Sequence, residues 1–219
     1  AGYPYLSVNC AGLFVTGAVT SSANFPSHPG SMPSNCNAYV LRLNPSSGAG
    51  EMLKVGTASS GSHFVPKAIA SGKDGVLHIG GTFVGTVNFA GSTISSSNGD
   101  DLFVLSITNT GILLKLSQVE GHDDQSMSSI AADAYGGVVV AGRFEDEVRF
   151  TGYPVNGWTS DENGFIGFAQ FGDAAPSPRL NALFNAPASV CRGDSSNLMS
   201  WLVPLEHGNA TTVVASSNT

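Results

Sequence analysis

The stretch Leu13-Phe-Val-Thr-Gly-Ala-Val19 decides the fold, because the chain contains two further versions of it. These are Leu77-His-Ile-Gly-Gly-Thr-Phe83 and Val138-Val-Val-Ala-Gly-Arg-Phe144. One glycine in each version aligns the three, with steps of 64 and 61 residues: Gly17, Gly81 and Gly142. A fixed step of several tens of residues is typical of repeat proteins, in which each repeat forms one supersecondary unit.

Two more sets of residues keep the same step. The first set lies eight residues beyond each glycine: Phe25, Phe89 and Phe150. The second set is aromatic, follows a small polar residue by two positions, and has steps of 64 and 62 residues: Tyr39, Phe103 and Phe165. Three sets of anchors in one register establish three repeat units.

Each unit has the sequence pattern of β-strands separated by turns. The second unit predicts four principal strands, with a hairpin-like return through Val87-Asn-Phe89 after the second of them: Val65–Ala70, Val76–Phe83, Leu102–Ile107 and Ile112–Leu116. Runs such as Val138-Val-Val-Ala141 are apolar at every position, which indicates a sheet covered on both faces. No stretch of 10 to 12 residues has the apolar periodicity of a helix.

These patterns predict an all-β fold, a β-propeller built of tandem four-stranded antiparallel blades. About three and a half blades are expected in this chain. The boundaries are 1–57 for the first blade, 63–120 for the second, 126–184 for the third, 185–199 for an inserted connection and 200–219 for the first two strands of a fourth.

At its anchors the chain resembles the SBBP-type β-propeller repeat. Blades of that family read as a Val-x-Val-x-Gly-x-Phe strand, a Val-x-Phe step, an Asp-x-Phe-Val strand and a turn containing glycine. The likeness covers about residues 6–172, is best in the second unit, and departs where Asn37 replaces the aspartate. The resemblance implies a propeller blade, usually extracellular or associated with the cell envelope, and no particular reaction.

Composition and charge narrow the classes of function. A net charge of −7, with nine Lys and Arg scattered along the chain, argues against a nucleic-acid surface. No apolar run approaches the roughly 20 residues of a membrane span. Three cysteines and one N-glycosylation sequon, Asn209-Ala210-Thr211, favour an extracellular or cell-surface protein with a disulfide.

Short motifs predict no catalytic residue, cofactor or metal. Arg192-Gly193-Asp194 matches the tripeptide of integrin ligands, but loops favour Gly and Asp for their geometry alone. The region Thr159 to Gly164 matches an Asp-box only in part. The acidic clusters His122-Asp-Asp124 and Glu145-Asp-Glu147 offer oxygen ligands for a hard cation but lack the spacing of a calcium loop, so solvated turns are the expectation.

Two functions from different classes remain. The favoured one is a non-catalytic extracellular scaffold, or a module that binds protein or glycan, within a larger homo-oligomeric or filamentous assembly. The alternative is a propeller-fold carbohydrate-active enzyme, a glycosidase or lyase, with acidic residues in the central channel. The expected partners are further copies of the chain or the remainder of its own polypeptide, because three and a half blades leave an unpaired edge and uncovered apolar faces.

The cysteines carry one structural expectation. Cys36 precedes the third strand of its unit and Cys10 lies in the turn between the first two, which places them at opposite ends of a blade. That separation is too large for a disulfide. We therefore expect Cys36 to pair with Cys191 rather than with Cys10.

Overall fold

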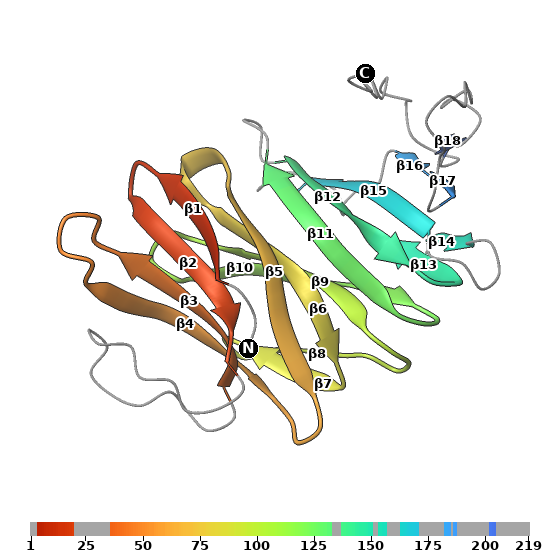
Figure 1. The fold of residues 1–219 in the computed structure, drawn as a ribbon, viewed down its shortest axis with the longest axis horizontal. Helices are drawn as coiled ribbons and strands as arrows, with labels where there is room; N and C mark the ends of the chain where they lie inside the picture. The colour runs from red at the N-terminus through yellow and green to blue at the C-terminus, as the bar shows by residue number, and fades with distance from the viewer. Residues whose placement is uncertain are drawn as a thin grey trace.

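The computed structural model is a row of antiparallel β-sheets (Figure 1). It describes residues 4–19, 36–132, 137–150, 153–156, 163–170, 182–184, 186–187 and 202–204. Within these residues there is no α-helix, and the one helical turn is the 3-10 segment η1 (Lys73–Gly75). The strands are β1 (Tyr5–Asn9), β2 (Gly12–Ala18), β3 (Cys36–Leu43), β4 (Gly50–Ala58), β5 (His63–Ser71), β6 (Leu77–Val84), β7 (Thr86–Phe89), β8 (Ser92–Ser95), β9 (Asp101–Ile107), β10 (Leu113–Gly121), β11 (Gln125–Ala132), β12 (Gly137–Phe144), β13 (Glu147–Phe150), β14 (Tyr153–Asn156), β15 (Asn163–Gln170), β16 (Ala182–Phe184), β17 (Ala186–Pro187) and β18 (Leu202–Pro204).

Three sheets correspond to the three repeat units. Sheet one has the order β1-β2-β3-β4-β7-β8, sheet two β14-β13-β10-β9-β6-β5, and sheet three β11-β12-β15-β17. The first strands of the units, β1, β5 and β11, lie next to one another along the row (Figure 1). The prediction of an all-β antiparallel architecture is confirmed. In the described part of the chain the sheets form an open row, not a closed ring.

Each of the first two sheets is completed by a hairpin from the next unit. The hairpin β7–β8 lies between β6 and β9 in the chain, yet β7 pairs with β4 of the preceding unit, with Gly56 opposite Phe89. The hairpin β13–β14 repeats this arrangement one unit later, where β13 pairs with β10 and Val148 lies opposite Gly121. The sequence pattern predicted the return strand but not its partner. Neighbouring repeat units are therefore joined by strand pairing as well as by packing of their sheets.

The sheets stack face to face through two apolar interfaces. The interface between sheets one and two is the larger, and its buried residues come from five strands and one hairpin: Phe14, Ala38, Val40, Phe64, Leu77, Ile79, Phe83, Val87, Phe89, Phe103, Leu105 and Ile107. The interface between sheets two and three has the same construction: Ala68, Leu102, Val104, Val119, Met127, Ile130, Val138, Val140, Phe144, Val148 and Phe165. Because sheet two is covered on both sides, every residue of its central strand β9 is buried.

The repeated glycines and aromatics form cross-strand pairs. Gly17 lies opposite Tyr39, Gly81 opposite Phe103 and Gly142 opposite Phe165, each on the second and third strands of its unit. The aromatic ring lies over the glycine, so a methyl group on Gly81 would come within 2.7 Å of the Phe103 ring and one on Gly142 within 2.9 Å of Phe165. The glycine and aromatic anchors found in the sequence therefore form the same cross-strand contact in all three units. Phe89, on the hairpin of sheet one, is buried against Phe64 of sheet two. The side chain of Phe150 is not described, and Phe25 lies outside the described residues.

A bulge explains why two of these positions admit only glycine. The first strand of unit two has an extra residue opposite the Gly80–Gly81 step, and the first strand of unit three has one opposite the equivalent step. The bulges bring the carbonyl oxygen of Val65 within 2.1 Å of a side chain added at Gly81, and that of Ser126 within 2.2 Å of one added at Gly142. Glycine permits this close approach of two backbones.

The strands after unit three differ from the expected boundaries, which ended the third blade at residue 184 and made 185–199 a connection. Residues Ala182–Phe184 are a strand, but β16 pairs with β18 and not with β15. The partner of β15 is β17, which lies in the segment expected to be a connection. Of the segment 200–219, expected to form two strands of a fourth blade, the structure describes β18 (Leu202–Pro204) alone.

Candidate functional site

Acidic side chains are concentrated at one end of sheets two and three, which we call the acidic end. Here β9, β11 and β13 begin and β10 and β12 terminate, so five strand ends meet. The main chain joins these ends through hydrogen bonds from Gln125 N to Asp100 O (2.8 Å), Glu145 N to Asp124 O (3.1 Å) and His122 N to Glu147 O (3.2 Å). Half of the chain's 16 acidic residues lie here: Asp100, Asp101, Glu120, Asp123, Asp124, Glu145, Asp146 and Glu147.

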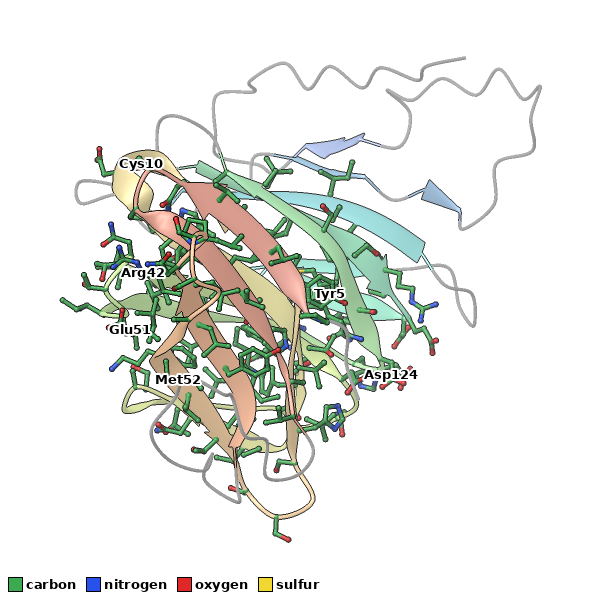
Figure 2. The ribbon with its side chains drawn as sticks, turned by 60° about the vertical axis from the view of Figure 1, so that its left-hand side comes forward. Tyr5, Cys10, Arg42, Glu51, Met52 and Asp124 are labelled. Atoms are coloured by element: carbon green, nitrogen blue, oxygen red, sulfur yellow. The ribbon has the colours of Figure 1, made fainter. Side chains whose placement is uncertain are left out.

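One group of side chains ties the start of β5 to the turns of the acidic end. His63 Nε2 lies 2.7 Å from Asp100 Oδ1, in an ion pair when the imidazole is protonated. Asp124, labelled in Figure 2, accepts a hydrogen bond of 3.0 Å from Asp100 N. The two partners of the ion pair are 47% and 34% exposed, so solvent screens the interaction and it contributes little to stability.

Asp101 is the buried carboxyl of the acidic end. Its Oδ2 accepts a hydrogen bond from Gln118 Nε2 (3.0 Å) and its Oδ1 accepts one from Gly121 N (3.1 Å). Burial raises the pKa of Asp101 from 3.8 to about 6; these two hydrogen bonds act in the opposite direction, while the nearby Glu120 and Asp100 raise it further. A raised pKa is what a general acid needs. Here, however, the carboxyl is 2% exposed and fixed between β9 and β10.

Three side chains approach one another closely enough to share a cation. One ligand atom from each of His122, Asp123 and Asp146 lies within 4.8 Å of the others, and His122 Nδ1 is 3.6 Å from Asp146 Oδ2. The group supplies one nitrogen and two oxygens, whereas calcium takes six to eight oxygens. His122 and Asp123 are exposed. The arrangement is therefore an incomplete coordination shell, and the prediction that the chain binds no metal stays a prediction.

Two further buried polar side chains had no signal in the sequence. Gln125 is 1% exposed, donates from Nε2 to Asp123 O, and has no hydrogen-bond partner at Oε1. His78, on β6, is 1% exposed and its Nδ1 lies 2.8 Å from Ser106 Oγ. Gln125 supports the turn that carries the acidic residues. The His78 pair links β6 to β9 inside sheet two.

The structure describes only part of the sequence-predicted sites. Cys10 lies in the turn between β1 and β2, is exposed and is a free thiol (Figure 2). Cys36 begins β3, and the register that pairs Ala18 with Ala38 and Leu13 with Leu43 puts it at the other end of the sheet, as expected. Cys191, Asn209, the Arg192 to Asp194 tripeptide and the Thr159 to Asp161 part of the Asp-box match lie outside the described residues.

No protein-family model matches the sequence, and no curated protein matches it. No described helix is long and apolar enough to cross a membrane.

Proposed function

We propose that this chain is a segment of a β-propeller of the SBBP-repeat type. It would serve as a non-catalytic extracellular scaffold, or as a module that binds protein or glycan, within a larger assembly. The observation that carries the proposal is the repeated packing: two successive interfaces use the same strand positions, including Phe103 in one and Phe165 in the other. A protein made of similar stacked units is suited to a scaffold that presents an extended binding surface.

The arrangement of strands supports the propeller. Four antiparallel strands per unit, with the first strands of successive units side by side, is how blades are placed around a common axis. The exchanged hairpins β7–β8 and β13–β14 hold each blade to the one before it. Both features are properties of the repeat and would continue through further units.

The position of the carboxylates favours a scaffold over the carbohydrate-active enzyme. In a propeller the first strand of each blade lines the central channel, and β1, β5 and β11 carry no Asp or Glu. Among the described carboxyls, the one with a strongly raised pKa is Asp101, which belongs to a third strand and is enclosed by Gln118 and Gly121. Its hydrogen bonds stabilise the connection between β10 and the next unit.

Two experiments test the proposal. A crystal structure or electron-microscopy reconstruction should show four-stranded sheets arranged around one axis, and a closed two-sheet sandwich would overturn the propeller. In parallel, the purified chain is incubated with a panel of polysaccharides, with Asp101→Asn as the matched variant. We expect binding without turnover for any glycan that is recognised. Turnover by the wild type that Asp101→Asn abolishes would overturn the non-catalytic function.

A further inference from the structure

We propose that Asn98 is a site of spontaneous covalent modification, at which the Asn98–Gly99 pair converts to aspartate and isoaspartate and loosens the junction between units two and three. The pair lies in the loop of residues 96–100, which joins β8 of sheet one to β9 of sheet two. Asparagine is a chemically labile residue, and a following glycine has no side chain to block the approach of its main-chain nitrogen. The inference is independent of the proposed scaffold function.

The loop of residues 96–100 is anchored at both ends. At its start, Ser96 N donates to Gly85 O (3.0 Å) and Ser96 Oγ accepts a hydrogen bond from Gly85 N (2.7 Å). At its end, Asp100 N donates to Asp124 Oδ1 (3.0 Å), and Asp100 O accepts a hydrogen bond from Gln125 N (2.8 Å). The second anchor joins unit two to the turn that begins unit three.

The middle of the loop has the features that the reaction requires. Asn98 is exposed. Neither the Asn98 side chain nor Gly99 N forms a hydrogen bond with the part of the chain that the structure describes. Gly99 has a φ of 64° and lies outside any strand, so no ladder holds this peptide unit extended. The amide carbon and the nitrogen that attacks it are therefore both free to approach each other.

The chemistry needs only water as a second reactant. Gly99 N loses its proton and attacks the Asn98 side-chain carbonyl carbon; a carbon–nitrogen bond forms, a five-membered succinimide ring closes, and the amide nitrogen leaves as ammonia. Water then attacks one of the two ring carbonyl carbons and breaks its bond to Gly99 N. Opening at the side-chain carbon gives aspartate, and opening at the main-chain carbon gives isoaspartate. No atom is oxidised or reduced.

A matched asparagine–glycine pair lies inside a strand. Asn163 and Gly164, in β15, pair with Phe144 and Arg143 of β12 on one side and with two residues of β17 on the other. The extended backbone of a strand keeps the nitrogen of the next residue away from the side-chain carbonyl carbon. Reaction at this pair therefore requires local opening of the sheet first.

The products disturb a tightly packed contact. A Cβ added at Gly99 would lie 2.7 Å from Asp124 Oδ1 and 3.0 Å from the main-chain carbon of Asp123, so Gly99 lies directly against the turn that carries Asp124, labelled in Figure 2. Isoaspartate lengthens the main chain by one carbon immediately before Gly99. Both products also add a negative charge beside Asp100, Asp123 and Asp124, and like charges repel one another. The loop should therefore hold the turn less firmly after modification.

Peptide mapping of wild type, incubated in mildly alkaline buffer and sampled over time, tests the modification. The Asn98 peptide should be replaced by two isomeric peptides with the mass of the acid. The Asn163 peptide should react at least about tenfold more slowly, because its ladder must open first. Asn98 that reacts no faster than Asn163 overturns the inference.

Hydrogen–deuterium exchange of peptides that cover residues 121–126 tests the effect on the junction. Aged wild type, separated by charge from unmodified protein, should exchange faster here than fresh wild type. Asn98→Gln, aged in the same way, should exchange like fresh wild type, because glutamine would have to close a larger ring and reacts far more slowly. Fresh Asn98→Asp, which adds the charge without the extra carbon, should lie between the two. No acceleration in aged wild type, or equal acceleration in aged Asn98→Gln, overturns the proposed loosening.

Discussion

The glycine beneath the aromatic anchor of unit two allows a quantitative test of the repeat. In Gly81→Ala the new Cβ would lie 2.1 Å from Val65 O, 2.7 Å from the Phe103 ring and 2.8 Å from Pro66 Cα. Two of these three atoms belong to the backbone of β5, so the clash is relieved only by moving a strand. Overpacking of this kind costs about 1 to 3 kcal/mol, and we expect the upper half of that range. For a chain of this size each kcal/mol lowers Tm by about 2 to 4 °C.

Two further glycines provide a graded comparison. Gly164, in β15, has no atom nearer than 4.0 Å to an added Cβ, so Gly164→Ala should be neutral or stabilise by up to about 1 kcal/mol through the reduced flexibility of the unfolded chain. The three atoms nearest to an added Cβ at Gly17 all belong to the side chain of Tyr39, with Oη at 2.7 Å. Gly17→Ala should therefore cost about 1 kcal/mol, and adding Tyr39→Phe should recover part of it by removing the nearest atom.

Urea unfolding followed by far-UV circular dichroism measures these differences, with the free energy of unfolding taken by linear extrapolation. The expected order of stability is Gly164→Ala above Gly17→Ala above Gly81→Ala. Equal loss for Gly81→Ala and Gly164→Ala would refute the argument from close backbone approach, because the two substitutions remove the same residue type from a β-strand.

Four other outcomes are expected. Phe89→Ala should lower the free energy of unfolding by about 3 to 5 kcal/mol, since this hairpin residue is 1% exposed. Its half-buried neighbour Asn88→Ala should cost clearly less, because it loses only hydrogen bonds to Thr93 and Gly91 at the surface; urea unfolding of both checks this. The pKa of Asp101 is raised in the folded chain, so the folded state binds this proton more tightly than the unfolded state does, and the contribution of Asp101 to stability decreases as pH rises from about 4 to about 6. Asp101→Asn should therefore flatten the plot of unfolding free energy against pH in this range. An unchanged plot contradicts the burial of a titrating Asp101. Non-reducing peptide mapping should find Cys36 linked to Cys191, and a Cys10 to Cys36 link would contradict the strand register. If the protein is made in a eukaryotic secretory pathway, mass spectrometry should find glycan on Asn209, and an unmodified peptide would count against it.

The sequence predicts the strands of the second unit well because their signal is local. The glycine and aromatic anchors stand in one register in all three units, and the structure shows that they form the same cross-strand pair each time. The partner of the hairpin β7–β8 could not be predicted in this way. The pattern of Val87-Asn-Phe89, buried at its first and last residues, is the same whichever strand lies beside it. Pairing with β4 depends on how the sheets stack, which is a non-local property.

The sequence predicted only part of the acidic end. Two acidic clusters, at 122–124 and 145–147, are apparent as separate turns, and the structure brings them together because both turns close the same end of adjacent sheets. The burial of Asp101 and Gln125 has no comparable signal. Polar residues at strand ends are usually solvated, whereas these two are buried and form hydrogen bonds with Gly121 and Asp123 of the turn that follows β10.

The exchanged hairpins have a consequence for how such a chain can gain or lose repeats. The boundary at which the sequence repeats is not the boundary at which a sheet is complete, because β4 is paired on its outer side only when the next unit is present. Duplicating or deleting one whole unit preserves this offset: every interior hairpin still finds a fourth strand, and every interior fourth strand still finds a hairpin. The number of repeats can therefore change in evolution without creating unpaired backbone inside the protein. A genetic cut at the end of unit one, by contrast, would leave β4 without β7 and expose the edge most prone to aggregation.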